Sequence, residues 1–201
     1  MMTASVNAPL LPGLLDPVLD SQRVFRAVLD ALARPGQIIP APVMPEAPRP
    51  LTGVAAALAL TLLDFETPLW LDGEMTAGGV ADYLRFHCGM PLVASPAEAQ
   101  FALVATPGSM PSLERFNQGI AEYPERSTTV IVQVPGLAGG RSVTLRGPGI
   151  DGEARLAVAG LPDSFWPQWA ENRALFPCGV DVIFAGPDGY AALPRSTRVE
   201  V

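Results

Sequence analysis

Apolar residues recur along the chain with two periods, one of about 3.6 residues and one of about 2, which alternate. The first helical stretch starts at Asp16 or Asp20 and runs to Ala33, where Arg34-Pro35-Gly36 ends it. We expect one side of this helix to be buried, and the residues of that stripe are Phe25, Val28, Leu29 and Leu32.

A second predicted helix, from Thr52 to Leu63, is apolar almost all round. Such a helix lies between layers of its own fold or under a partner. A third helix follows Thr76 and ends at Gly89, Ser112 opens a short fourth one, and an aromatic helix begins at Asp163 or Ser164.

Short runs with strand character lie between and after these helices. Two pairs of them predict hairpins: residues 128–134 with 142–146 around Gly139-Gly140, and 180–185 with 190–193 around Pro187-Asp188-Gly189. Helices that alternate with strands early and hairpins late predict an α/β sandwich, a mixed sheet with helices on both faces. The other strand candidates are 37–39, 67–71, 92–93, 101–105 and 153–158.

The length of 201 residues fits a single domain, and no linker divides it. We expect residues 1–15, interrupted by Pro9, Pro12 and Gly13, to be a flexible arm before a domain over residues 16–201. The longest apolar run, Val54 to Leu63, is shorter than the roughly 20 residues of a membrane span, and we expect a soluble chain without a targeting segment.

Charge and composition exclude several function classes. The formal net charge of −7 argues against nucleic-acid binding. The chain has no lysine, which excludes a Walker phosphate loop and a pyridoxal-phosphate Schiff base. A single histidine and no C-x-x-C leave no basis for a metal site. Charged residues make up 16% and hydrophobic ones 49%, which favours a surface partly covered by other chains, although alanine richness explains some of this.

The candidate chemistry is that of an anion site, because a guanidinium binds phosphate or phosphonate oxygens with two parallel hydrogen bonds. Arg195 with the hydroxyls of Ser196 and Thr197 fits this, and the alternative is an arginine that only pairs with an acid such as Asp181. His87 is either a general base or phosphate donor, or a histidine favoured at a helix end. The further candidates are Arg34 and Arg85, and no catalytic residue can be assigned.

The sequence Gly147-Pro148-Gly149-Ile150-Asp151-Gly152 matches the glycine pattern of dinucleotide sites. A strand-like segment follows it, so no helix N-terminus is available to hold a pyrophosphate. We interpret it as a turn.

Several segments of the sequence, by their residues, order and spacing, resemble the PhnH family, the H subunit of the bacterial carbon–phosphorus lyase system. The resemblance covers residues from about Asp16 to Val201. The segments are FRAVLDALARPG (25–36), ALTLLDFETPLWL (59–71), LRFHCGMPLV (84–93), TTVIVQVPGL (128–137), RGPGI (146–150), FPCGVDV (176–182) and LPRSTRVEV (193–201).

The resemblance implies a cytoplasmic subunit that works with the G, I and J subunits and forms homodimers when isolated. With ATP as substrate of the complex, an alkylphosphonate would displace adenine to give a ribose 1-phosphonate 5-triphosphate. The implied fold is a three-layer α/β/α sandwich similar to the pyridoxal-phosphate transferases, without that cofactor or a metal on this subunit. The family pattern supplies no catalytic residues to transfer. The sequence lacks paired acid–base groups, which favours a scaffolding or ligand-holding role. The alternative is a stand-alone enzyme that acts on a phosphonate or phosphate ester with His87 and Arg195.

Overall fold

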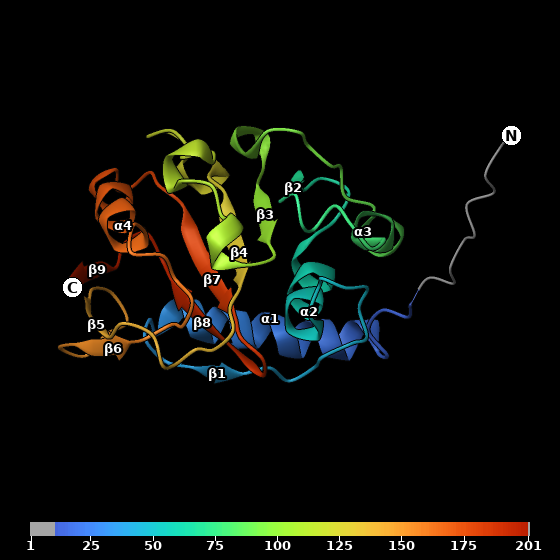
Figure 1. The fold of residues 1–201 in the computed structure, drawn as a ribbon, viewed down its shortest axis with the longest axis horizontal. Helices are drawn as coiled ribbons and strands as arrows, with labels where there is room; N and C mark the ends of the chain where they lie inside the picture. Colours follow the sequence, from blue (N-terminus) through green and yellow to red (C-terminus); the bar gives the residue numbers. More distant parts are fainter. Residues whose placement is uncertain (1–10, 201) are drawn as a thin grey trace, which may run out of the picture.

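A mixed six-stranded sheet forms the centre of the computed structural model, which describes residues 11–200 (Figure 1). The strand order is β1-β8-β7-β4-β3-β2, in which β2, β3, β4 and β7 are parallel and β8 and β1 run antiparallel to their neighbours. The predicted α/β class with a mixed sheet is therefore confirmed. The six strands are β1 (Ile39–Pro40), β2 (Leu69–Leu71), β3 (Phe101–Val104), β4 (Thr129–Gln133), β7 (Asp181–Ala185) and β8 (Gly189–Leu193).

The central strands β4 and β7 are apolar on both faces, as strands covered on two sides must be. Ile131 and Ile183 face one hydrophobic cluster, whereas Val132 and Phe184 face the other. The hairpin predicted around Pro187-Asp188-Gly189 is present, and it joins β7 to β8.

Helices α1, α2 and α3 pack together with one face of this sheet. The apolar helix predicted over residues 52–63 is α2, which Thr52 caps by accepting a hydrogen bond from the Ala55 amide at 3.3 Å. Its residues from Val54 to Ala59 are buried against elements of the same chain, so α2 lies between layers. Over residues 11–200 the α-helices are α1 (Pro17–Ala33), α2 (Gly53–Leu62), α3 (Val80–Cys88) and α4 (Phe165–Ala174).

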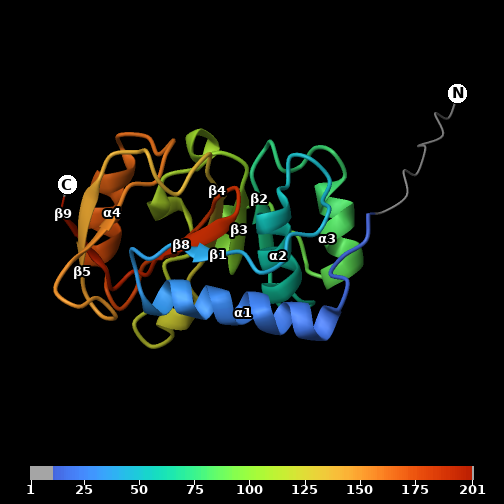
Figure 2. The same cartoon turned by 90° about the horizontal axis from the view of Figure 1, so that it is seen from below.

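Only part of the predicted stripe of α1 is buried. Val28 is buried and Leu32 packs partly buried against the core, whereas Phe25 and Leu29 are 48% and 50% exposed. Small residues such as Ala27 and Ala31 face inward beside Val24 and Val28, because they let α1 approach the alanine-rich α2 closely. Phe25 and Leu29 are left on the outer surface of α1, which runs along much of the length of the molecule (Figure 2).

The other face of the sheet is covered by α4 and a second, three-stranded sheet of order β6-β5-β9. The hairpin predicted around Gly139-Gly140 is wrong. Strand β4 already has β3 and β7 on its two edges, so β5 cannot pair with it and pairs with β6 and β9 instead. The strands of this sheet are β5 (Val143–Arg146), β6 (Ala154–Leu156) and β9 (Arg198–Glu200).

The helix predicted from Ser112 is a single 3-10 turn, η3 (Leu113–Arg115). The Gln118 side-chain amide donates to the Leu113 carbonyl at 2.8 Å and so takes an acceptor that a continuing helix would need. Gly119, at a φ of +71°, then turns the chain away.

Residues 1–10 of the predicted arm lie outside the described residues. Leu11 packs against the core, and its carbonyl oxygen lies 3.0 Å from His87 Nε2 on α3. Within residues 11–200, no helix is long and apolar enough to cross a membrane.

Candidate functional site

Arg195 follows β8 and lies over the first residue of β7. Its Nε donates to both carboxylate oxygens of Asp181, at 3.1 and 3.2 Å, and its Nη2 also donates to Asp181. Nη1 donates to the Pro124 carbonyl at 2.7 Å, and the Arg195 backbone amide donates to Asp181 at 2.7 Å. The two side chains are only 15% and 19% exposed, so this guanidinium fork is turned inward onto a carboxylate of the same chain.

The two hydroxyl residues after Arg195 belong to a segment fixed on α4. The Ser196 carbonyl accepts from Arg173 Nε and the Thr197 carbonyl accepts from Trp169 Nε1, both at 3.1 Å. Thr197 is fully buried, and its hydroxyl has no hydrogen-bond partner within residues 11–200. An anion in solution cannot reach that hydroxyl.

The other candidates lie elsewhere. Arg34 pairs with Asp30 at 3.1 Å at the end of α1, and Arg85 pairs with Asp82 at 3.3 Å on α3. The His87 ring packs edge-on against Tyr83 and bonds to the Leu11 carbonyl. Since α3 and the β9–α4 region lie at opposite ends of the molecule in both views, the six candidates Arg195, Ser196, Thr197, Arg34, Arg85 and His87 do not converge on one site (Figures 1 and 2).

The RGPGI segment (146–150) forms a turn between β5 and β6, in which the Ile150 backbone amide donates a hydrogen bond to the Gly147 carbonyl at 3.2 Å. Gly147 lies against the backbone of Ser196 and Thr197, and Gly149, at a φ of +79°, lies against the Ala33 carbonyl. This turn therefore joins the end of α1 to the C-terminal segment. A side chain at either glycine would collide with backbone or crowd it.

The sequence analysis missed a buried carboxylate at the carboxyl end of β2. Asp72 is 1% exposed and accepts from the Met75 and Ala105 amides at 2.8 Å and from the Ser109 hydroxyl at 2.5 Å. Ligands of open α/β sheets bind at this edge. All three donors of this carboxylate come from the chain itself, so it holds the loops after β2 and β3 together. An Asp-Gly pair directly after a strand was the available signal.

Gln133, at the end of β4, was missed as well. Its Oε1 accepts from the Thr52 amide at 2.6 Å, and its Nε2 donates to the Pro50 and Ala105 carbonyls at 3.1 and 3.2 Å. The side chain therefore links the start of α2 to the carboxyl edge of the sheet.

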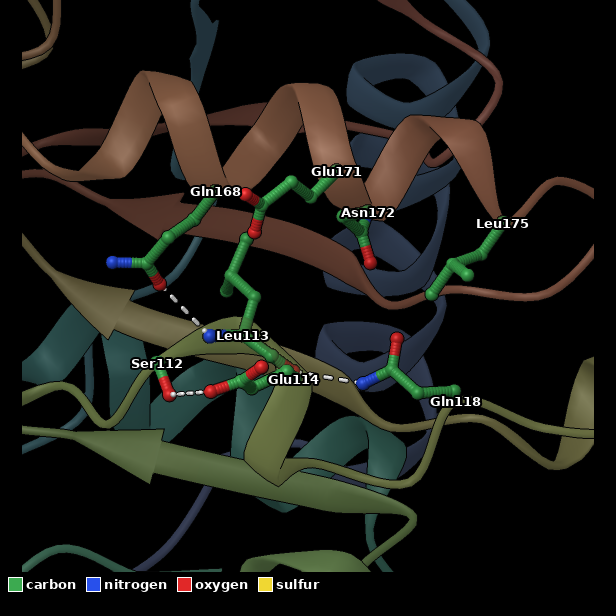
Figure 3. A pocket seen from close by; sticks show the side chains of 8 residues that line it. All are labelled: Ser112, Leu113, Glu114, Gln118, Gln168, Glu171, Asn172 and Leu175. Carbon is green, nitrogen blue, oxygen red and sulfur yellow. Dashed lines mark hydrogen bonds between the residues drawn. The ribbon is translucent and has the colours of Figure 1, made fainter.

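A pocket of about 350 Å³ lies between α4 and η3, and none of the six predicted residues lines it (Figure 3). The Leu113 backbone amide donates a hydrogen bond to Gln168 Oε1 at 3.0 Å across it. The side-chain Nε2 of Gln118 donates to the Leu113 and Phe116 carbonyls, both at 2.8 Å. Two carboxylates, those of Glu114 and Glu171, belong to its wall. The lining residues are Ser112, Leu113, Glu114, Gln118, Gln168, Glu171, Asn172 and Leu175.

Burial raises the pKa of two other reactive groups. Burial, with a smaller contribution from the Asp64 charge, raises the pKa of Cys88 to about 11, so its thiol is neutral and a poor nucleophile at pH 7. Burial also raises the pKa of Tyr190 above its usual range. Within residues 11–200, no three His, Cys, Asp or Glu side chains gather as a metal site would need.

Comparison with known proteins identifies the family. The model of the family described as bacterial phosphonate metabolism protein (PhnH) matches residues 12–200. The chain belongs to the PhnH family. One PhnH relative, the alpha-D-ribose 1-methylphosphonate 5-triphosphate synthase subunit PhnH of Rhizobium meliloti (strain 1021), is 39% identical over 185 residues, which are 92% of each chain. The putative C-P lyase subunit protein HtxG of Stutzerimonas stutzeri is 30% identical over 180 residues, 90% of this chain and 86% of that protein.

Proposed function

We propose that the chain is a subunit of a ribose 1-methylphosphonate 5-triphosphate synthase in phosphonate catabolism. The observation that carries this proposal is the identity of 39% to the Rhizobium meliloti subunit over 92% of both chains. A match that runs through nearly the whole domain favours a shared role in the same kind of complex. The complex would use ATP and an alkylphosphonate and release adenine.

We propose a scaffolding or ligand-holding role for this subunit, with no cofactor of its own. Two observations support this role: the arginine predicted to bind an anion holds Asp181 of its own chain, and the candidate residues lie at opposite ends of the fold. Anion binding by Arg195 would therefore be secondary to its contact with Asp181.

The further expectations concern partners, place and fold. The G, I and J subunits would be the partners, in the cytoplasm, and the isolated chain would form a homodimer. The outer surface of α1, which exposes Val18, Phe25 and Leu29, supports an interface better than α2, because α2 is already buried. The layering would be that of the pyridoxal-phosphate transferases.

The test is an assay that leaves out one subunit at a time. Purified G, I and J subunits are incubated with ATP and methylphosphonate, with and without this chain, and adenine is measured by chromatography. We expect adenine only when the chain is present, and none from the chain alone. Release by the chain alone at the rate of the full mixture would favour the stand-alone enzyme, and an equal rate without the chain would refute a subunit role.

A further inference from the structure

The pocket between α4 and η3 presents two negative charges and no positive one. Neither Glu114 nor Glu171 forms an ion pair within residues 11–200, and the Ser112 hydroxyl is a hydrogen-bond donor to Glu114, at 3.3 Å. Asn172 contributes nothing further, because its side-chain amide is bonded at both ends to the Val180 backbone at 2.8 and 3.0 Å. A ligand that suits this wall carries hydrogen-bond donors and a positive charge.

A third acceptor belongs to the pocket wall. Gln118 uses its amide nitrogen for two carbonyls, while its Oε1 is buried and has no donor within residues 11–200. Figure 3 shows this oxygen facing the space between Asn172 and Leu175. Leu175 is 49% exposed, so its side chain can rotate away when a ligand enters. The ligand would then bring a hydrogen-bond donor to Gln118 Oε1, which water does not reach.

Exposed apolar side chains lie in the pocket wall and in the two segments that continue from its lining residues. Leu175 and Phe176, at the end of α4, and Ile120, in the loop after η3, are each about half exposed. The two segments that carry them are joined by a hydrogen bond of 2.8 Å from the Gly179 amide to the Gln118 carbonyl. Exposed apolar residues beside a charged pocket are typical of a protein contact, in which such residues exclude water from a central anchor.

We propose that this pocket receives an arginine side chain of another subunit of the complex. A guanidinium supplies only donors, keeps its charge at all physiological pH values and is weakly hydrated, so it can leave water for a pocket walled by Leu113 and Leu175. Its aliphatic stem would lie on those leucines while the planar head reaches the carboxylates. The inference rests on the proposed function, because it takes the chain to be one subunit among several.

Neutralising the two glutamates tests the proposal without altering their shape. The variant Glu114→Gln/Glu171→Gln is compared with wild type and with the matched control Glu74→Gln/Glu98→Gln, which changes two exposed glutamates outside the pocket. Affinity for the assembled G, I and J subunits is measured by surface plasmon resonance, and folding by circular dichroism. We expect binding about tenfold weaker or worse for the pocket variant, since hydrogen bonds to charged groups are lost at an interface. The control should keep wild-type affinity.

A small probe examines the pocket itself. Butylguanidinium is titrated into the wild-type chain alongside butylurea, its neutral analogue of similar shape, while the side-chain amide signals of Gln118 and Gln168 are followed by NMR. We expect shifts with butylguanidinium only, and none in the pocket variant. Absence of such shifts in the wild-type chain would overturn the proposal.

The remaining outcomes distinguish failure of the docking inference from failure of the proposed function. If the wild-type chain binds its partners and the pocket variant binds them equally well, the docking inference is refuted and the proposed function stands. If butylguanidinium binds but assembly does not depend on the glutamates, the pocket takes free guanidinium compounds and the docking inference is again overturned. If the wild-type chain binds none of the subunits, the proposed function fails and the inference falls with it.

Discussion

Replacing Arg195 with alanine should lower the free energy of unfolding by about 2–3 kcal/mol, between the values for exposed and fully buried ion pairs. The guanidinium donates to both oxygens of Asp181 and to the Pro124 carbonyl, and both charged side chains are more than four-fifths shielded from water. After the substitution, the Asp181 carboxylate keeps the backbone amide of residue 195 at 2.7 Å but loses its counter-charge. For a domain of this size the loss corresponds to a fall in Tm of about 5–10 °C.

The assay is urea unfolding at pH 7, followed by circular dichroism, with Asp181→Asn and the double variant completing a mutant cycle. Arg34→Ala is the control, because its pair with Asp30 is about half exposed and should contribute less than about 0.5 kcal/mol. Suppose that Arg195→Ala lowers the free energy of unfolding no more than Arg34→Ala does, while the affinity for phosphate or phosphonate falls. The ion pair with Asp181 is then not the main role of Arg195. That result would return Arg195 to the role of an anion ligand.

Three further predictions concern other contacts. Gly149→Ala should lower the free energy of unfolding in urea by about 3 kcal/mol or more, because Gly149 has a φ of +79° and abuts the Ala33 carbonyl. Gly152→Ala, at a φ of +71° in open space, should lower it by about 1 kcal/mol, and equal losses for the two variants would contradict this. Cys88, whose pKa is about 11, should react with iodoacetamide far more slowly in the native chain than in urea, and faster as the pH rises toward 11, as measured by mass spectrometry; native labelling at the unfolded rate at pH 7.5 would show that its thiol is not held neutral. His87→Ala should release the segment at Leu11–Gly13 and speed proteolysis there, whereas His87→Gln, which retains a hydrogen-bond donor, should slow that proteolysis relative to His87→Ala. Identical cleavage of both variants and wild type would show that the 3.0 Å contact with Leu11 does not hold the segment.

The sequence predicted those elements whose pattern depends on local chemistry. The α1 boundaries follow from the Asp16 cap and the 34–36 stop, and the hairpin of β7 and β8 follows from its Pro-Asp-Gly turn. The all-apolar α2 was correctly expected to be buried, but the pattern alone could not say whether its own chain or a partner covers it.

The errors arose where distant segments decide the outcome. Which side of α1 is buried depends on close packing against the alanines of α2, so Ala27 and Ala31 face inward while Phe25 and Leu29 stay outside. Pairing of β5 with β9 brings together strands about fifty residues apart, which a glycine turn cannot indicate. The choice between an anion and Asp181 for Arg195 also depended on where β7 begins relative to the end of β8, a relation that the sheet fixes.

The most direct measurement of the central claim is a titration of this chain into fixed amounts of the G, I and J subunits with ATP and methylphosphonate. A subunit should raise the rate of adenine release in proportion and then reach a plateau at a fixed molar ratio to its partners. A rate that keeps rising with added chain, or that is unchanged by it, would contradict the assignment of this chain as a subunit of the synthase.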